Sequence, residues 1–236
     1  MIAARGLCKS FDGTPVLRDM DLDIVRGRVT AIVGPNGAGK TTFIKSLLGL
    51  VRPDSGLLTF EGNAIGASHA YRARIGYMPQ IAQFPENLTG ADFFALLRDL
   101  RGATSIDERL IDDFGLRESL RRKLRVLSGG TRQKMNAVAA FLFEPALYVL
   151  DEPTTGLDPV SAGILKRRII EERGAARTVI LTSHILADVD ELADDVVFLH
   201  EGQARFVGNV RDLKRQTGQL TTERAIAELM LRERAA

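Results

Sequence analysis

Short and almost continuously apolar runs stand out along this chain. Val29–Val33 and Ala146–Leu150 are such runs, and they are typical of strands buried on both faces of a parallel sheet. After the second run, apolar spacing predicts alternating helices and strands over 159–173, 178–182, 185–193 and 196–200. A β-α-β-α-β series of this kind predicts an α/β fold.

Alternating apolar and polar positions near the N-terminus predict a second sheet. Residues 2–7 and 15–25 alternate in this way, which indicates antiparallel strands with one exposed face. Shorter strands are predicted over Gly56–Gly62 and Arg74–Gln80, and Pro79 stops the second of them. The N-terminal region is therefore expected to form an antiparallel β-subdomain.

A long stretch with helical spacing separates the β-rich halves. From Thr89 to Leu127 the pattern is helical with no strand, and Thr89–Asp92 resembles a capping box. A further helix is predicted after Ser128, and a terminal helical pair beyond Val210. The expected organisation is a domain over 1–208, a helical subdomain inserted at about 88–145, and a C-terminal helical tail over 209–236.

Composition indicates an ordinary soluble globular protein. Of the 236 residues, 45% are hydrophobic and 26% are charged, and the formal net charge of +2 is too small to indicate a nucleic-acid partner. No run approaches the roughly 18 apolar residues of a membrane-spanning helix, and the N-terminus lacks the apolar core of a signal peptide. Cys8 is the single cysteine, and no His/Cys spacing suggests a transition-metal site. We expect a cytoplasmic chain.

The segment Gly34–Thr41 carries the strongest chemical signal. It fits the phosphate-binding pattern G-x-x-x-x-G-K-[ST], and it lies between a predicted buried strand and a helix that begins near Lys40. Glycines let the backbone turn its N–H groups toward a phosphate, and the helix N-terminus adds positive potential. Lys40 would reach the β- and γ-phosphates, and the Thr41 hydroxyl would bind Mg²⁺. The alternative is a glycine-rich turn that binds nothing.

Two carboxylates follow the buried run that ends at Leu150. Asp151 stands where P-loop proteins place the acid that supports Mg²⁺. Because successive strand residues face opposite ways, Glu152 is expected to point elsewhere and is better suited to be the general base for an attacking water. The alternative is a helix N-cap pair leading into Pro153.

Two further side chains are candidates because of their positions. His184 follows the strand 178–182, so it is expected on the same rim of the sheet, where it could donate to a γ-phosphate or orient water. Phe11 lies in a turn with one aromatic ring left over, and that ring could stack on a nucleotide base. The alternatives are a structural histidine and a hydrophobic turn anchor.

Taken together, these motifs resemble the ATP-binding subunit of an ABC transporter. Gly34–Thr41 resembles the Walker A loop, Leu147–Glu152 the Walker B strand, and Leu127–Gly130 the family signature. Gly156–Asp158 resembles the D-loop, and His184 resembles the switch histidine. The resemblance runs from about residue 2 to residue 208. It implies a P-loop NTPase of the ABC type, with an N-terminal antiparallel β-subdomain and an inserted α-helical subdomain.

The resemblance also implies a set of site residues and the cofactors ATP and Mg²⁺. Catalysis is assigned to Glu152, His184 and Lys40, and Mg²⁺ binding to Thr41, Gln80 and Asp151. The residues expected to contact nucleotide are Phe11, Gly34, Pro35, Asn36, Gly37, Ala38, Gly39, Lys40, Thr41, Thr42, Gln80, Ser128, Gly129, Gly130 and Asp158.

The implied partners are a second ATP-binding subunit and a membrane permease. In the family the signature binds the nucleotide of the other subunit, so two chains, here expected to be identical, sandwich two ATP molecules. The loop from Ile81 to Leu88, with an exposed Phe84 and Pro85, is the predicted permease contact. Through it the chain would lie at the inner face of the cell membrane. Basic residues that could attract ATP, or form only a solvated face, are Arg117, Arg121, Arg122, Lys123, Arg125, Arg132 and Lys134.

One position departs from the family pattern. Thr131 follows the signature where the family more often has glutamine, and hydrolysis should survive the change because Ser128 and backbone N–H groups do the binding. The continuation Thr131–Lys134 resembles a subgroup serving copper-site maturation of nitrous oxide reductase, and it would equally suit exporters of lipids, drugs or other solutes. The alternative functions are a soluble ABC-type ATPase acting on DNA or ribosomes, and a nucleotide-binding assembly or regulatory module.

Overall fold

The fully buried strands form the centre of a six-stranded sheet. In this computed structural model, which describes residues 1–66 and 68–235 (with side chains up to 232), every residue of β3, β7 and β8 is buried. The order across the sheet is β10-β9-β3-β8-β7-β6, parallel except for the β9–β10 pair. The strands are β3 (Val29–Val33), β6 (Ile75–Met78), β7 (Leu147–Asp151), β8 (Thr178–Thr182), β9 (Asp195–His200) and β10 (Gln203–Asn209). The predicted α/β fold is confirmed.

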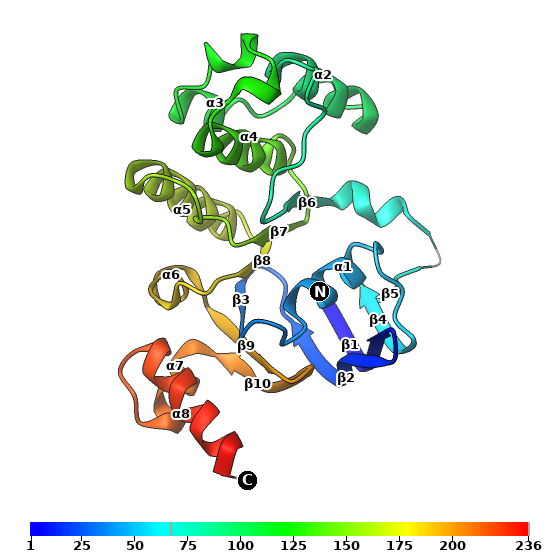
Figure 1. The fold of residues 1–236 in the computed structure, drawn as a ribbon, viewed down its shortest axis with the longest axis vertical. Coiled ribbons are helices and arrows are strands. Elements are labelled where there is room, and N and C mark those ends of the chain that lie inside the picture. The colour runs from blue at the N-terminus through cyan, green and yellow to red at the C-terminus, as the bar shows by residue number, and fades with distance from the viewer. Residues whose placement is uncertain (67, 236) are drawn as a thin grey trace.

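The alternating N-terminal segments form a separate antiparallel sheet, as predicted (Figure 1). Its order is β2-β1-β4-β5, and along β2 the side chains of Leu17, Met20, Leu22 and Ile24 are buried, with strict alternation from Met20 to Ile24. The strands are longer than the predicted 2–7 and 15–25 ranges on one side, because the hairpin pairing continues to its turn: β1 (Ile2–Phe11), β2 (Thr14–Ile24), β4 (Ser55–Phe60) and β5 (Asn63–Ala64).

Two apolar cores cover the two faces of the parallel sheet. On one face, helix α1 (Lys40–Leu47) packs between the parallel sheet and the N-terminal sheet, with Phe43 and Ile44 fully buried. On the other face, α5 (Pro159–Gly174) and α6 (Leu186–Leu192) pack with the inserted helices, and Leu165 and Val189 are fully buried. The sheet is thus a middle layer, and the ends of its strands are left free for chemistry.

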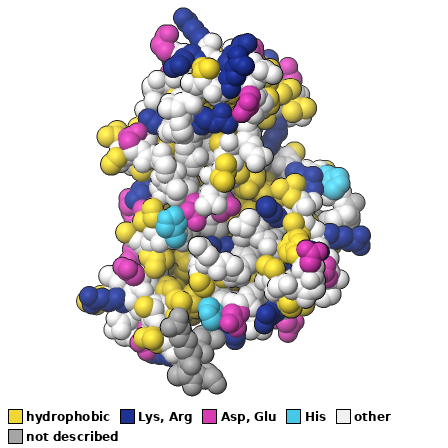
Figure 2. All heavy atoms as spheres, viewed as in Figure 1, with side chains coloured by type: hydrophobic (Ala, Val, Ile, Leu, Met, Phe, Trp, Pro, Cys, Tyr) yellow, Lys and Arg dark blue, Asp and Glu magenta, His cyan; other side chains and the backbone are white. Residues whose placement is uncertain are grey.

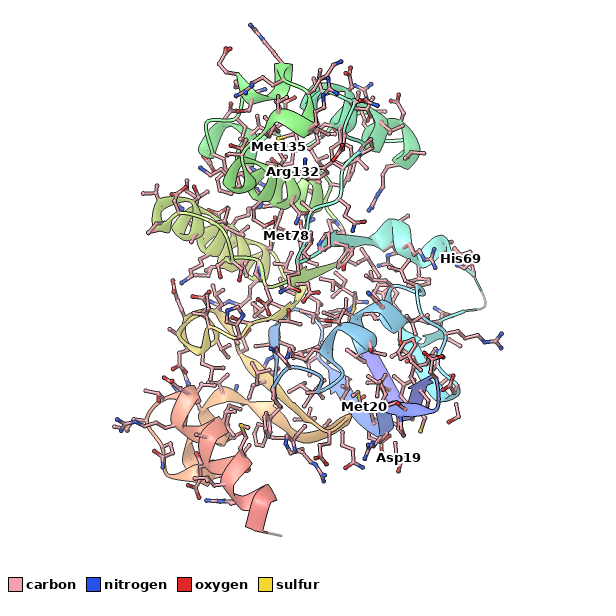
Figure 3. The ribbon with its side chains drawn as sticks, in the orientation of Figure 1. Asp19, Met20, His69, Met78, Arg132 and Met135 are labelled. Carbon is pink, nitrogen blue, oxygen red and sulfur yellow. The ribbon has the colours of Figure 1, made fainter. Side chains whose placement is uncertain are left out.

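The inserted helices form a lobe at one end of the molecule, at the top of Figure 1. They are α2 (Gly90–Arg101), α3 (Arg109–Asp113) and α4 (Gly129–Phe141). The capping box at Thr89–Asp92 is confirmed. The region up to Leu127 is less helical than predicted, because short 3₁₀ turns at Ser119–Arg121 and Leu124–Val126 replace longer helices. Figure 3 shows Arg132 and Met135 on α4 above Met78 of β6, where the lobe meets the sheet.

The predicted terminal helical pair is present. It consists of α7 (Val210–Thr217) and α8 (Thr222–Ala235), and α8 packs against α6. Leu213 and Ala225 are fully buried in this contact region.

A 3₁₀ turn at Ala70–Arg74, between β5 and β6, was not predicted.

A buried ion cluster ties the helical lobe to α5. The Arg168 guanidinium, only 4% exposed, contacts Asp107 at 2.7 Å and Glu172 at 2.6 Å. Asp107 also pairs with Arg109 of α3. Burial alone would raise the pKa of Asp107, but hydrogen bonds from Arg109 and Arg168 outweigh burial and hold this pKa well below its ordinary range.

We expect Asp107→Asn to lower the free energy of unfolding by about 2 kcal/mol at pH 7, because it leaves the buried Arg168 without one of its counter-ions. A carboxylate with a depressed pKa in the folded state stabilises the protein above its unfolded pKa and loses this contribution as the pH falls. The difference between the wild type and Asp107→Asn should therefore shrink below about pH 4.

Denaturant unfolding at pH 7 and pH 3 measures both effects. Asp99→Asn is the matched control, because the Asp99 carboxylate is mostly exposed (69%) in its pair with Arg98; it should change stability by less than about 0.5 kcal/mol. A loss for Asp107→Asn that is equal at the two pH values would contradict the expected linkage.

Candidate active site

The glycine-rich loop joins the end of β3 to the start of α1, as its motif predicts. The Lys40 ammonium donates to the backbone oxygens of Gly34 at 2.7 Å and Pro35 at 3.0 Å. The N-cap of α1 is Gly39, so no side chain caps the first N–H groups of the helix. Uncapped N–H groups at a helix start form a favourable place for an anion.

Two glycines of this loop are required by close packing. Gly34 and Gly39 have φ values of 151° and 101°. A Cβ at Gly34 would lie 2.1 Å from the Leu199 carbonyl oxygen, and one at Gly39 would lie 2.9 Å from the Val16 oxygen. Gly37, with φ of 81°, faces open space instead. The loop conformation therefore depends on glycine for clearance at two positions and for backbone freedom at the third.

A cavity of about 190 Å³ lies over this loop and contains most of the predicted site. Two segments distant from the loop reach it, one carrying Gln80 and one carrying Asp151 and Glu152. Val16 also lines the cavity, and no sequence signal marked this residue. The predicted residues that line the cavity are Asn36, Gly37, Ala38, Gly39, Lys40, Thr41, Thr42, Gln80, Asp151 and Glu152.

Asp151 ends β7 as a buried carboxylate. It is 5% exposed, and the Thr182 hydroxyl at the end of neighbouring β8 donates to it. Burial raises the pKa of Asp151, and the Thr182 hydrogen bond opposes the rise. Thr182 is a supporting residue that no sequence motif marks, although the strand that it ends was predicted.

The prediction for the direction of the Glu152 side chain is wrong. It was expected to point away from the place of Asp151, yet both carboxylic residues line the cavity. The alternation of strand residues does not apply, because β7 ends at Asp151 and Glu152 has a left-handed backbone with φ of 51°. The alternative of an N-cap pair is wrong, since Asp158 caps α5.

His184 lies on the predicted rim of the sheet, and its partner is Glu152. Its Nδ1 is 2.6 Å from a Glu152 carboxylate oxygen, and its side chain is 61% exposed. The Glu152 amide donates to the Thr182 carbonyl and the Thr155 hydroxyl donates to Glu152. Burial lowers the pKa of Lys40, against the opposing charges of Glu152 and Asp151. The cavity therefore combines a cation and two carboxylates, and the His184 imidazole contacts one of these carboxylates.

Other predicted site residues lie outside this cavity. Phe11 is at the end of β1 and is 44% exposed, and the Lys9 ammonium lies 5.3 Å from the centre of its ring. Ser128 caps α4 by accepting from the Thr131 amide, and the two hydroxyls are 2.9 Å apart. Asp158 caps α5 and pairs with Lys134 of α4 at 3.1 Å.

The signature segment lies in the helical lobe, beside the D-loop segment of the same chain. A Cβ built on Gly130 would be 3.6 Å from the Gly156 oxygen, and nothing lies within 4 Å of one built on Gly129. Ser128, Gly129 and Gly130 therefore present an open helix start away from the P-loop cavity.

The basic surface around the signature is smaller than predicted. Arg117 is paired with Glu108 and Asp112. Arg132 donates to backbone oxygens and lies over the Phe84 ring, and Lys134 is paired. Figure 2 shows Lys and Arg side chains at the end of the molecule formed by this lobe. The remaining basic residues of the predicted set are Arg121, Arg122, Lys123 and Arg125.

Comparison with known proteins decides the family. The family model described as "ABC transporter" matches residues 17–155, more than half of the chain. This chain belongs to the ABC transporter family. The predicted resemblance is confirmed, and so is its functional meaning: the chain is an ATP-binding subunit with ATPase activity.

Among curated relatives, the daunorubicin/doxorubicin resistance ATP-binding protein of Streptomyces peucetius is 36% identical over 223 residues, covering 92% of this chain and 68% of the relative. The ABC-type transporter ATP-binding protein EcsA of Bacillus subtilis is 30% identical over 224 residues, with coverage of 92% and 91%. The expectation of a copper-maturation subgroup stays a prediction.

Solved structures agree with this ABC assignment. The structure of an ATP-binding subunit of an ABC transporter has a TM-score of 0.91 and 31% identity, covering 98% of this chain and 99% of that one. A dimeric, post-hydrolysis ATP-binding cassette bound to ADP and Pi shares the fold, with a TM-score of 0.80 and 21% identity. Within the part of the chain that the structure describes, no helix has the length and apolar character to cross a membrane.

The packing around the P-loop generates a test with a matched pair of variants. Gly34→Ala should destabilise the protein by about 3 kcal/mol and abolish ATP binding, because its Cβ meets the Leu199 carbonyl. Gly37→Ala meets open space, so only backbone strain of about 1 kcal/mol is expected. Thermal unfolding and equilibrium ATP binding measure the two effects, and equal losses for the two variants would contradict this account.

Proposed function

We propose that this ABC subunit hydrolyses MgATP in the cavity over its P-loop and does so between two copies of the chain, driving a permease that exports its solute. The observation that carries the proposal is the meeting of Lys40, Thr41, Gln80, Asp151 and Glu152 around one cavity. These residues come from three separate segments, and together they supply positive charge, oxygen ligands and a base.

The residues present fit Mg²⁺. Thr41, Gln80 and Asp151 offer a hydroxyl, an amide oxygen and a carboxylate, which are the hard oxygen ligands that this ion takes. Asp151 is buried with a raised pKa, so a divalent cation would compensate a carboxylate that burial disfavours. When bound, Mg²⁺ neutralises charge that develops on the phosphates. Thr41, Gln80 and Asp151 would hold it.

Glu152 is assigned the general base and His184 the group that holds it. The 2.6 Å contact with His184 orients the Glu152 carboxylate while its backbone leaves the strand in a left-handed turn. Glu152 would take a proton from water as that water attacks the γ-phosphate. Lys40, close to both carboxylates, stabilises the charge on the transferred phosphoryl group.

A second copy of the chain would complete the site. Ser128, Gly129 and Gly130 form an open helix start that does not line this chain's own cavity. The exposed start of α4 in one copy, where backbone N–H groups favour an anion, can meet nucleotide held by the P-loop of another. Phe11 and Asp158, both at exposed positions, are assigned to contacts with nucleotide in the closed pair. A fold shared with a dimeric ADP-bound cassette supports this arrangement.

The permease contact is assigned to a groove between the sheet and the helical lobe. It has a volume of about 340 Å³, and Leu50, Tyr77 and Phe93 are among its lining residues. The loop after Gln80 runs along it, with Ile81 73% exposed. One detail of the prediction is wrong: Phe84 is half-buried, because it packs on Phe93 with ring centres 5.1 Å apart. Pro85 is exposed, as expected.

The names of relatives support export as the proposed direction of transport. Their names describe daunorubicin resistance, lantibiotic transport, bacitracin transport and Nod factor export. An export system is therefore the proposal for this chain, with the subunit held at the inner face of the membrane by its permease. None of these four names describes a soluble ATPase that acts on DNA or ribosomes, which is the alternative function.

Glu152→Gln tests the mechanism. We expect kcat for ATP hydrolysis to fall about 1,000-fold, because a general base contributes typically 10²–10⁴-fold, while ATP binding is retained. With the hydrolysis step blocked, the ATP-bound dimer should accumulate, as measured by light scattering after size-exclusion chromatography.

Glu171→Gln is the control, because Glu171 is an exposed carboxylate on α5 outside the cavity. Its kcat should equal that of the wild type. Undiminished turnover in Glu152→Gln would remove Glu152 from the role of base. A Glu152→Gln protein that stays monomeric with saturating ATP would count against the two-copy site.

A charged substitution in the groove tests the permease contact. Leu50→Asp should reduce the fraction of the subunit retained on washed membranes about tenfold, because it places an unpaired charge in an apolar contact. Leu220→Asp is the matched control, since Leu220 is exposed on the far C-terminal tail. The ATPase activity of the isolated subunit should be normal in both. Equal membrane retention of the two variants would place the contact elsewhere.

A further inference from the structure

We propose that Asp188 is a positioning residue for hydrolysis: by binding the Thr154 hydroxyl, it holds the Glu152 segment against helix α6 and so sets the contact between Glu152 and His184. The inference rests on the proposed roles of these two residues. It concerns a buried contact outside the P-loop cavity.

The contact is short and shielded from water. The Thr154 hydroxyl donates to Asp188 Oδ2 at 2.6 Å. Thr154 is 9% exposed and Asp188 is 6% exposed. A hydrogen bond to an ionised acceptor is about twice as strong as a neutral one, and a buried carboxylate that loses a partner is costly. This hydrogen bond therefore fixes the distance between the Thr154 hydroxyl and the Asp188 carboxylate.

The second oxygen of Asp188 fixes α6 to its neighbour. Lys166 of α5 contacts Asp188 Oδ1 at 2.6 Å, and it also pairs with Glu191 of α6. The ammonium compensates the charge of the buried carboxylate. Asp188 thus joins three elements, namely the loop after β7, α5 and α6, so Thr154 is held against a rigid frame rather than a single helix.

Two hydrogen bonds, called ties below, lie next to the contact between Glu152 and His184. On the sheet side, the Glu152 amide donates to the Thr182 carbonyl at 3.2 Å. On the helix side, Thr154 is tied to Asp188. Glu152 itself carries the first tie and lies two residues before the second, and His184 lies between Thr182 and Asp188 on the other segment. If the second tie is lost, the loop after β7 can turn about the first and move the Glu152 carboxylate.

The opposite side of α6 offers a matched contact that does not touch the catalytic segment. There the Thr222 hydroxyl of α8 donates to Asp190, which also pairs with Lys214 of α7 at 2.8 Å. Figure 1 shows α6 between α5 and the two C-terminal helices. Thr222 is fully buried, as Thr154 nearly is. Each threonine therefore joins a different neighbour to α6 through the same chemistry.

The experiment compares Thr154→Val with Thr222→Val in the full chain. Each replaces a buried hydroxyl by a methyl group of similar shape and removes one threonine–aspartate hydrogen bond. We expect similar falls in Tm for the two variants. Thr154→Val should lower kcat about tenfold with KM for ATP unchanged, because small misplacement of a catalytic group reduces turnover. Thr222→Val should keep the wild-type kcat.

A conservative variant and a second site extend the test. Thr154→Ser retains the hydroxyl and should restore most of the kcat. Asp188→Asn removes the ionised acceptor and should lower kcat as Thr154→Val does, which keeps the proposal testable if the valine variant does not fold. In a His184→Ala background, Thr154→Val should cause little additional loss, because residues that act as a unit are not additive.

Three results would overturn the inference: normal kcat in Thr154→Val, an equal loss in Thr222→Val, or a full additional tenfold loss in the His184→Ala background. Glu152→Gln is measured in the same series. If that variant keeps its turnover, the proposed base itself is wrong; if it loses turnover while Thr154→Val does not, only the positioning role fails.

Discussion

The site depends on one constraint, which is that the parallel strands β3, β7 and β8 are buried along their whole length. An uncompensated charge is costly inside strands of this kind, so charged chemistry begins where they end. The pairing of these strands brings their carboxyl ends together. Thr182 of β8 pairs with Asp151 of β7 on one side and with Ile32 of β3 on the other. The P-loop, the carboxylates and His184 therefore share one edge because their strands are neighbours.

At this edge the backbone takes conformations that ordinary strand geometry does not allow. Gly34 clears the Leu199 carbonyl only because it lacks a Cβ, and Glu152 has a positive φ without being glycine. Such conformations cost about 1–3 kcal/mol and persist where surrounding contacts hold them. Around Glu152 the ties come from Thr182, His184 and the loop residue Thr154, so the catalytic geometry is a property of several elements rather than of one motif.

The position of the signature in the helical lobe supports the proposal that a second copy completes the site. The lobe carries the signature at the start of α4, outside the cavity of its own chain, and it is fixed to the core by the buried Arg168 cluster. Lys134 adds a link from α4 to the D-loop residue Asp158. These contacts join the lobe to the core, which is consistent with the proposed closure on nucleotide with a second copy.

Local patterns were enough to predict the strands, the main helices, the capping box and most of the cavity, because apolar periodicity and the P-loop motif involve residues close in sequence. They failed where distant residues meet. The shared cavity of Asp151 and Glu152, the half-buried Phe84, the neutralised Arg117 and the Thr154–Asp188 bond each depend on which segments pack side by side. That pairing is a property of three-dimensional packing, and no spacing along the chain encodes it directly.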